Sequence, residues 1–292
     1  MTIFERQASK FRNAPPEIVA GRYHLYVCWA CPWAHRTVIG RMLMGLEDVI
    51  SMSAVDPIRN DTDGWAFTGG EYTDPINGWS LLGEGYRITD PGFSDRVSVP
   101  VLWDKEAGVI VNNESADVLR MLSTDFAPLA EHPVELVPDG LRDDIDELNG
   151  RIYDDLNNAV YQAGFTTDQE HYEERVRAMF ALLAELDERL AGQRFLFGSE
   201  PLETDWRLFT TLVRFDAVYA IHFKCSLRKI AEFDHLWPYL RDLYQQPGIA
   251  GTVRLDEIRR HYYCTHPKVN PSGLVALLPD EDFDAPAGRE AL

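Results

Sequence analysis

The sequence has 292 residues and a formal net charge of −19, from 28 Lys and Arg against 47 Asp and Glu, which disfavours binding to the phosphates of a nucleic acid. Hydrophobic residues make up 45% of the chain, enough for a core, yet no run approaches the roughly 18 apolar residues that cross a membrane. The polar N-terminus has no apolar signal core, so we expect a cytoplasmic protein without a nucleic-acid or membrane partner.

The N-terminal half predicts an α/β domain that follows an irregular arm. Residues 22–29 alternate and are rich in Tyr and Val, which indicates a strand. A helix is expected from about Pro32 to Met44, because the missing N–H of proline would be unpaired at a first helical position in any case. The pattern continues with a strand over 49–56, an irregular stretch over 57–96, a hairpin over 98–113 and a helix over 114–122. This order is that of a thioredoxin-like domain.

The C-terminal half predicts helices only. Between residues 171 and 192, apolar residues recur at three- and four-residue spacing, which is typical of an amphipathic helix. Residues 206–223 are more uniformly apolar and predict a buried central helix, and residues 234–249 predict another. We therefore expect an arm over 1–20, a thioredoxin-like thiol-binding domain over 21–125, a linker over 126–140, and an all-α domain with a C-terminal extension over 141–292.

Cys28 and Cys31 form a C-x-x-C motif in a chain with only four cysteines, too few for a secreted disulfide framework. Cys31 directly precedes the predicted helix, where unpaired N–H groups and the helix dipole stabilise a thiolate, so we expect it to be the nucleophile. Cys28, at a predicted strand end, is either a small buried hydrophobic residue or a disulfide partner of Cys31. We expect an extended backbone to keep the two apart. No second C-x-x-C completes a zinc centre, so no metal is expected.

Six motifs, in the same order along the chain, connect the sequence to a known family. They are CPWAHR at 31–36, SVPVLWD at 98–104, NNESADVLRM at 112–121, RLFTTLVRFDAVY at 207–219, FKC at 223–225 and RRHYYCTHPKVNPSG at 259–273. With these motifs the chain resembles the glutathionyl-hydroquinone reductases, the Xi class of the glutathione transferases. The resemblance implies the glutathione transferase fold, a homodimer, and glutathione or a related thiol such as γ-glutamylcysteine as cofactor.

The resemblance also implies a thiol-binding site. Val99 precedes Pro100, whose expected cis peptide bond would turn the backbone of Val99 towards the nucleophile. Glu114 would bind the γ-glutamyl ammonium group and Ser115 a ligand carboxylate, unless the two residues only cap a helix. Two further positions belong to the site by resemblance, each with a structural alternative: Trp65, otherwise a loop anchor in the core, and Arg87, otherwise a surface arginine.

The implied reaction is the reductive cleavage of S-glutathionyl-hydroquinones to hydroquinones. The Cys31 thiolate would attack the sulfur of the conjugate, and a second thiol would resolve the resulting mixed disulfide. Tyrosine hydroxyls would stabilise the charge that develops on the quinol oxygens. The resemblance assigns catalytic roles to Tyr161, Tyr262 and Tyr263 and places Tyr219 in the substrate pocket; the alternative for each is a core aromatic residue.

The sequence leaves two other classes of function open. A glutaredoxin-like thioltransferase or dehydroascorbate reductase would use Cys31 but would lack the tyrosines. A non-catalytic binding protein with the same fold would not need a thiolate beside a γ-glutamyl site. The chain also departs from the family at Leu202, where a helix-capping threonine is usual, so the cap near Asp205 must be made differently.

Overall fold

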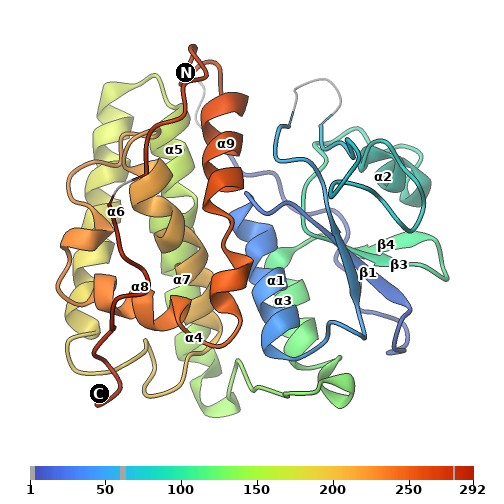
Figure 1. Ribbon diagram of the computed structural model, residues 1–292, viewed down its shortest axis with the longest axis horizontal. Helices are drawn as coiled ribbons and strands as arrows, with labels where there is room; N and C mark the ends of the chain where they lie inside the picture. Colours follow the sequence, from blue (N-terminus) through green and yellow to red (C-terminus); the bar gives the residue numbers. More distant parts are fainter. Residues whose placement is uncertain (1–3, 60–63, 279) are drawn as a thin grey trace. The chain divides into compact units, whose positions relative to one another are not determined.

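The computed structural model describes residues 4–59, 64–278 and 280–292, which form two compact units. The sheet unit comprises Gln7–Glu135 and Asp256–His261. The helical unit comprises Leu136–Leu255 and Tyr262–Leu292, together with the first residues up to Arg6. Figure 1 labels the helices and strands of both units.

The sheet unit contains a four-stranded sheet in the order β2-β1-β3-β4. β1 pairs with β2 in parallel, whereas β3 runs antiparallel to both β1 and β4, which confirms the predicted thioredoxin-like arrangement. The strands are shorter than the segments predicted from the sequence, because only their central residues pair. Their bounds are β1 (Tyr23–Val27), β2 (Ser51–Ala54), β3 (Val101–Asp104) and β4 (Val109–Asn112).

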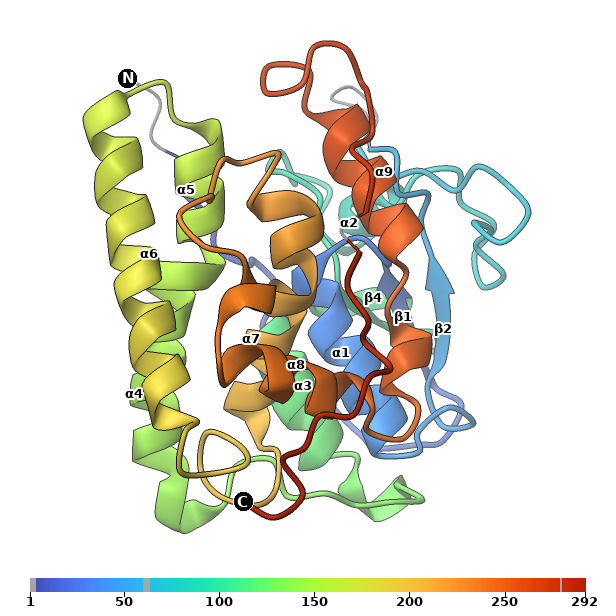
Figure 2. The same ribbon diagram turned by 60° about the vertical axis from the view of Figure 1, so that its left-hand side comes forward.

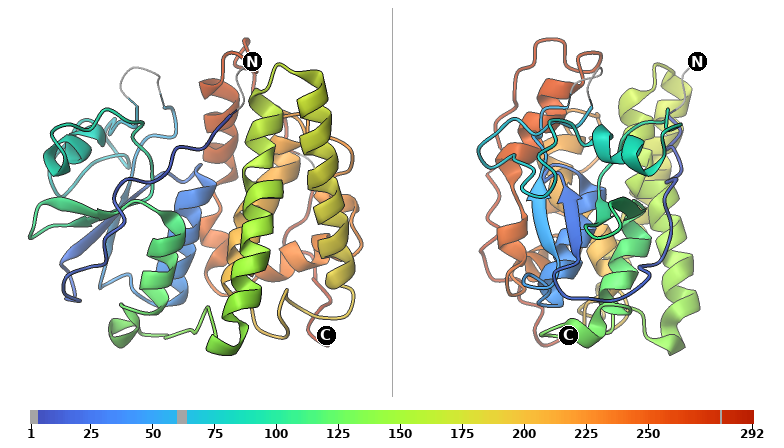
Figure 3. Two further views of the ribbon diagram at one scale, coloured as in Figure 1. Left: turned by 180° about the vertical axis from the view of Figure 1, so that it is seen from behind. Right: turned by 90° about the vertical axis from the view of Figure 1, so that its right-hand side faces the viewer.

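Two helices lie side by side on one face of this sheet, α1 (Pro32–Leu43) and α3 (Ser115–Ser123) (Figures 1 and 3). Side chains of α3 pack directly against Gly40 of α1, where an added Cβ atom would come within 2.7 Å of Leu119 Cδ1. A larger residue at Gly40 would therefore force the side chain of Leu119 to move. This close packing matters for the site, because the N-terminus of each helix carries a predicted functional residue.

The stretch over residues 57–96 is more ordered than the sequence predicts, since its described part contains helix α2 (Gly83–Thr89). Two glycines in seven residues hide this helix from propensity arguments. Tertiary contacts stabilise it instead: Tyr86 is buried, and its hydroxyl donates to Ser98 O at 2.7 Å. The buried carboxylate of Asp74 organises the preceding turn by accepting from Trp79 N and from the hydroxyl of Tyr26.

The described residues of the helical unit form helices and no strand, as predicted, apart from an isolated bridge between Phe195 and Gly198. α4, the π-helical turn η3 and α5 form one continuous column, and α6 runs back beside it (Figures 2 and 3). No described helix is both long and apolar enough to span a membrane. The elements are η2 (Asp139–Leu141), α4 (Arg142–Ile152), η3 (Tyr153–Asn157), α5 (Ala159–Phe165), α6 (Gln169–Arg189), α7 (Glu203–Arg214), the π-helical turn η4 (Phe215–Tyr219), η5 (Ile230–Glu232), α8 (Leu236–Tyr244), η6 (Ile249–Thr252) and α9 (Leu255–Thr265), which also contributes to the sheet unit.

Helix α7 together with the π-helical turn η4 corresponds to the central helix predicted over residues 206–223, and every residue of α7 is buried. It begins at Glu203, and its N-terminus retains half of a capping box. Asp205 Oδ2 accepts from the backbone N–H of Leu202 at 2.8 Å, whereas the leucine side chain has no oxygen with which to return the bond. The other carboxylate oxygen of Asp205 accepts from Leu196 N and from the hydroxyl of Tyr239. Backbone carbonyls take the place of the missing threonine oxygen at the helix start, because Glu203 N donates to Leu136 O at 3.0 Å and Asp205 N donates to Leu202 O at 3.1 Å.

Candidate active site

Cys31 lies between β1 and α1, at the position that the sequence predicts. It is the N-cap of α1, with Pro32 as the first helical residue. The partly buried thiol donates to the carbonyl oxygen of Val99, with Sγ 3.7 Å from that oxygen. The first N–H groups of a helix have no partner inside the helix, and the helix dipole adds a partial positive charge there. The start of α1 therefore places backbone N–H groups and a partial positive charge beside the sulfur of Cys31.

Val99 and Pro100 form the wall beside this sulfur. Their peptide bond is cis, as the resemblance implies, and both residues are buried just before β3. The carbonyl oxygen of Val99 is directed at Cys31, so the main chain of Val99 lies next to the nucleophile. A thiol compound held against this main chain would have its own sulfur close to Cys31.

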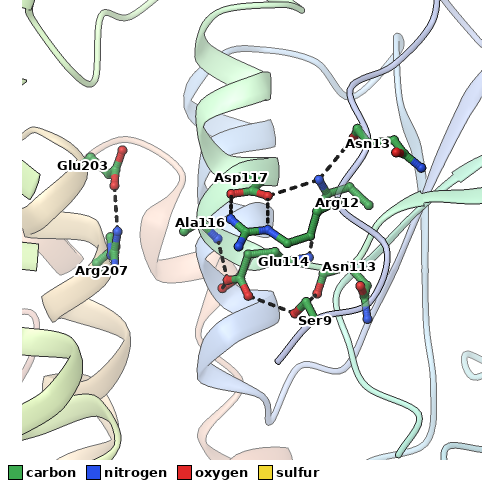
Figure 4. A network of polar contacts seen from close by, with 11 residues as sticks. Ser9, Arg12, Asn13, Asn113, Glu114, Ala116, Asp117, Glu203 and Arg207 are labelled. Atoms are coloured by element: carbon green, nitrogen blue, oxygen red, sulfur yellow. Dashed lines mark hydrogen bonds and ion pairs between the residues drawn. The ribbon is translucent and has the colours of Figure 1, made fainter. Parts of the chain in front are cut away.

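Glu114 and Ser115 begin α3, and the structure gives them different positions at the helix start, which the sequence did not predict. Glu114 is the N-cap, and its Oε1 accepts from Ala116 N at 3.2 Å. Ser115 is the first helical residue, and its buried hydroxyl donates to the same Oε1 at 3.4 Å. The second carboxylate oxygen, Oε2, points away from the helix (Figure 4). Glu114 can therefore cap α3 through Oε1 while Oε2 stays available to a ligand.

Three tyrosine hydroxyls meet in the helical unit, and we call them the tyrosine triad. The hydroxyl oxygen of Tyr262 lies 2.6 Å from that of Tyr161 and 3.0 Å from that of Tyr219. Tyr161 follows the π-helical turn η3, and Tyr219 ends the π-helical turn η4. Such turns change the direction of the side chains that follow them and are frequent at functional sites.

Burial keeps two members of the triad protonated. Tyr219 and Tyr262 are buried, and desolvation raises the pKa of both hydroxyls well above the usual value. The nearby guanidinium group of Arg214 lowers the pKa of both, but by less than burial raises it. Tyr161 is partly exposed, unlike the other two members. At neutral pH, Tyr219 and Tyr262 are uncharged hydrogen-bond donors.

Tyr263 lies outside the triad, although the sequence motif places it beside Tyr262. Its side chain is buried, and its hydroxyl donates to Ala217 O in η4 at 3.2 Å. The hydroxyl hydrogen is therefore directed at the main chain of the helical unit. This is the position of a core aromatic residue, the alternative that the sequence left open, and a catalytic role for Tyr263 stays a prediction.

Comparison with known proteins decides the family. The glutathione S-transferase N-terminal domain model matches residues 30–125, and the C-terminal domain model matches residues 169–245. The chain is 47% identical to the glutathionyl-hydroquinone reductase YqjG of Escherichia coli (strain K12), over 98% of this chain and 92% of that protein. The chain belongs to the Xi class of the glutathione transferases.

Solved structures agree with this assignment. The Xi-class glutathione transferase of Natrialba magadii is 52% identical, with a TM-score of 0.95 over 99% of this chain and 91% of the other. The glutathione-bound structure of Escherichia coli YqjG is 48% identical, with a TM-score of 0.90 over 93% and 89% of the two chains. The predicted glutathione transferase fold is thereby confirmed.

Two further predicted site residues of this Xi-class transferase lie in the sheet unit. Trp65 is buried and stacks on His261, with ring centroids 5.5 Å apart. This packing suits the structural alternative, an anchor for the loop, and leaves the predicted ligand contact as a prediction. Arg87 is exposed on α2, and no contact described for it joins it to Cys31 or Glu114.

The expected extended backbone between Cys28 and Cys31 is wrong. Cys31 N donates to Cys28 O at 3.0 Å, which closes a turn around Trp29 and Ala30. The two Cα atoms of such a turn lie within about 7 Å, so backbone distance does not prevent a disulfide. Both cysteines are nevertheless free, and Cys28 is fully buried. Burial raises the pKa of the Cys28 thiol well above its usual value, which makes Cys28 a poor nucleophile.

Oxidation of this transferase by glutathione disulfide should therefore give mainly a mixed disulfide on Cys31. An attack by Cys28 would need a thiolate in a fully buried position, and thiolates rather than thiols attack disulfides. Intact-protein mass spectrometry under denaturing, non-reducing conditions measures the outcome, with the Cys31→Ser variant as the control that forms no adduct at this site. A main product that has lost two hydrogens and carries no glutathionyl group would show that Cys28 resolves the intermediate.

The residues that surround the triad were largely missed by sequence reasoning. Phe4 in the N-terminal arm stacks on Tyr161 at 5.6 Å, and a lone aromatic residue in an irregular arm carries no sequence signal. The His266 ring packs on Tyr262 with ring centroids 5.7 Å apart, and His266 Nδ1 lies 3.1 Å from His222 Nε2. Among the described residues, no three His, Cys, Asp or Glu side chains are grouped to hold a metal ion.

Proposed function

We propose that this Xi-class transferase cleaves S-glutathionyl-hydroquinones reductively, with Cys31 as the nucleophile. The observation that carries the proposal is a cysteine at the N-terminus of α1 with its sulfur against the Val99 carbonyl. A transferase that conjugates thiols needs a serine or tyrosine to hold a free thiolate, whereas a cysteine would trap that thiol as a disulfide. The name of the Escherichia coli relative, glutathionyl-hydroquinone reductase, supports the same chemistry.

The first step forms a mixed disulfide. The Cys31 thiolate attacks the sulfur of the aryl thioether, a sulfur–sulfur bond forms, and the sulfur–carbon bond breaks. The conjugate reacts as the keto tautomer of its hydroquinone. The electron pair of the broken sulfur–carbon bond moves into the ring, and the ring becomes an enolate. A proton then returns the product to hydroquinone, so the ring is reduced and the two sulfur atoms are oxidised.

The second step restores Cys31. A second thiol attacks the mixed disulfide at the glutathionyl sulfur, releases the oxidised thiol dimer and regenerates the thiolate of Cys31. The net reaction consumes one conjugate and one thiol and yields one hydroquinone and one disulfide. Cys28 is too deeply buried to supply this second thiol efficiently.

The tyrosine triad supplies the hydrogen bonds that this reaction needs. Negative charge develops on the quinol oxygens as the enolate forms, and preorganised uncharged donors lower the energy of that charge. Tyr161, Tyr219 and Tyr262 are such donors, already oriented by their mutual contacts. The nearby guanidinium group of Arg214 adds a positive charge, which offsets part of the rise that burial causes in the pKa of Tyr219 and Tyr262.

The thiol in this proposal is glutathione, which one homologous structure holds. γ-Glutamylcysteine offers the same γ-glutamyl and cysteinyl groups to Val99, Glu114 and Ser115. We also propose that the enzyme acts in the cytoplasm, where thiols are kept reduced, and works as a homodimer, as its resemblance to the family implies.

The test is a product analysis with a single S-glutathionyl-hydroquinone and a panel of thiols: glutathione, γ-glutamylcysteine, cysteine and 2-mercaptoethanol. Chromatography should show hydroquinone and disulfide in equal amounts, fastest with the thiols that carry a γ-glutamyl group. Reduction of a simple mixed disulfide without hydroquinone release would identify a thioltransferase instead. Binding of the conjugate without turnover would identify a binding protein.

A further inference from the structure

The N-terminal arm is paired to the edge of the sheet rather than irregular. Asn13 N donates to Val111 O at 3.1 Å, and Asn113 N donates to Phe11 O at 2.9 Å, so Arg12 lies opposite Asn112 in an antiparallel bridge. β4 is an edge strand, and an edge strand has unpaired backbone groups that a further segment can use. Pairing sets the register of the arm against the segment that leads into α3.

This register brings Ser9 to the carboxylate of Glu114. In an antiparallel bridge that pairs residue 12 with residue 112, the residues before position 12 run alongside the residues after position 112. Ser9 Oγ accordingly lies 2.9 Å from Glu114 Oε2 and 3.1 Å from Asn113 O. The hydroxyl has one hydrogen, and the carboxylate is the nearer and stronger acceptor.

The two oxygens of Glu114 are therefore held from opposite sides (Figure 4). Oε1 accepts from the helix start at Ala116 N, and Oε2 accepts from the arm at Ser9 Oγ. A glutamate side chain has several rotatable bonds, and holding it at both oxygens removes most of its freedom before a ligand arrives. A carboxylate oxygen has more than one lone pair, so Oε2 can accept from Ser9 and from an ammonium group together.

We propose that Ser9 is a positioning residue for the γ-glutamyl subsite, holding Glu114 Oε2 where the ammonium group of the thiol ligand binds. The inference rests on the proposed function, which assigns Glu114 to that ammonium group. Ser9 acts through Glu114 and makes the subsite selective for thiols that carry a γ-glutamyl group. The arm is thus part of the thiol-binding site as well as a cover for the sheet edge.

The arm stays in place without the hydroxyl of Ser9, because contacts on both sides anchor it. Gln7 bonds to both backbone groups of Arg96. Lys10 forms an ion pair with Asp90. Arg12 forms two hydrogen bonds to Asp117, at 2.8 and 2.6 Å, which also appear in Figure 4. A serine-to-alanine change should therefore affect the orientation of Glu114 and leave the arm docked.

The experiment measures binding of S-methylglutathione, which has the γ-glutamyl group but cannot react, to the full chain by calorimetry. Ser9→Ala should weaken binding about three- to tenfold, the effect of losing the preorganisation of one flexible side chain. Ser9→Thr, which keeps the hydroxyl, should restore binding. Lys10→Ala is the matched control, because it breaks the ion pair of the same arm with Asp90 and leaves the surroundings of Glu114 unchanged, and it should stay within about twofold of the parent.

Two comparisons separate positioning from a general loss of structure. S-methyl-cysteinylglycine lacks the γ-glutamyl group, so Ser9→Ala should not change its binding. In a Glu114→Gln background, which itself weakens S-methylglutathione binding, Ser9→Ala should have little further effect, since the two residues act as a unit.

Several results would overturn the inference. Unchanged or tighter binding in Ser9→Ala would show that the hydroxyl has no role or competes with the ammonium group. Equal weakening by Ser9→Ala and Lys10→Ala would show that Ser9 is only a structural contact of the arm. Because S-methylglutathione undergoes no reaction, these results are independent of whether the enzyme cleaves hydroquinone conjugates.

Discussion

Replacing Cys31 with alanine should abolish cleavage of S-glutathionyl-hydroquinones, with a loss of at least about a thousandfold, because the substitution removes the atom that forms the mixed disulfide. Cys31→Ser should be as inactive, since an alcohol at this position cannot accept the glutathionyl sulfur in a disulfide. Both variants should fold normally, because Cys31 caps α1 through its backbone and makes no side-chain capping bond. Steady-state release of hydroquinone is the measurement, with circular dichroism to verify the fold.

Cys28→Ala is the matched control for this prediction. Cys28 is fully buried and a poor nucleophile, so the variant should keep most of the activity and lose about 1 kcal/mol of stability from the removed sulfur. If Cys28→Ala folds and loses as much of the rate of hydroquinone release as Cys31→Ala does, a mechanism with one nucleophilic thiol is contradicted.

Replacing Tyr161 with phenylalanine should slow cleavage of the quinol conjugate by about ten- to a thousandfold, the range for losing one donor to a developing negative charge. Reduction of a simple mixed disulfide should change little, because its leaving group is a thiolate that needs no such donor. The ratio of the two rates, measured on the same preparation, checks the prediction. Equal slowing of both reactions would show that the hydroxyl supports the fold or the thiol site.

Tyr263→Phe is the comparison that the structure provides. The resemblance to the family assigns a catalytic role to Tyr161 and to Tyr263 alike. The hydroxyl of Tyr263 donates to Ala217 O, so we now expect its removal to cost about 1 kcal/mol of stability and to affect the rate less than the change at Tyr161 does. A larger loss of conjugate cleavage in Tyr263→Phe than in Tyr161→Phe would restore Tyr263 as the main donor.

The sequence by itself determined the features that depend on neighbours in the chain. Pro32 after Cys31 marked both the start of α1 and the cysteine at its cap, because helix capping involves only a few consecutive residues. Alternation and three- to four-residue periodicity located the strands and the main helices for the same reason. The turn between Cys28 and Cys31 is also a local feature, but the prediction of an extended backbone there is wrong. C-x-x-C spacing is compatible with both a turn and an extended link.

Only the tertiary structure decided which side chains share a site. Ser9 and Glu114 are 105 positions apart, and Tyr161 and Tyr262 are 101 apart, so no local pattern connects them. Their contacts depend on the pairing of the arm with β4 and on the π-helical turns that direct the tyrosines. Motifs could name Tyr262 and Tyr263 as a pair, but a helix sends adjacent residues in different directions. Packing therefore gave one hydroxyl to the triad and the other to the main chain of η4.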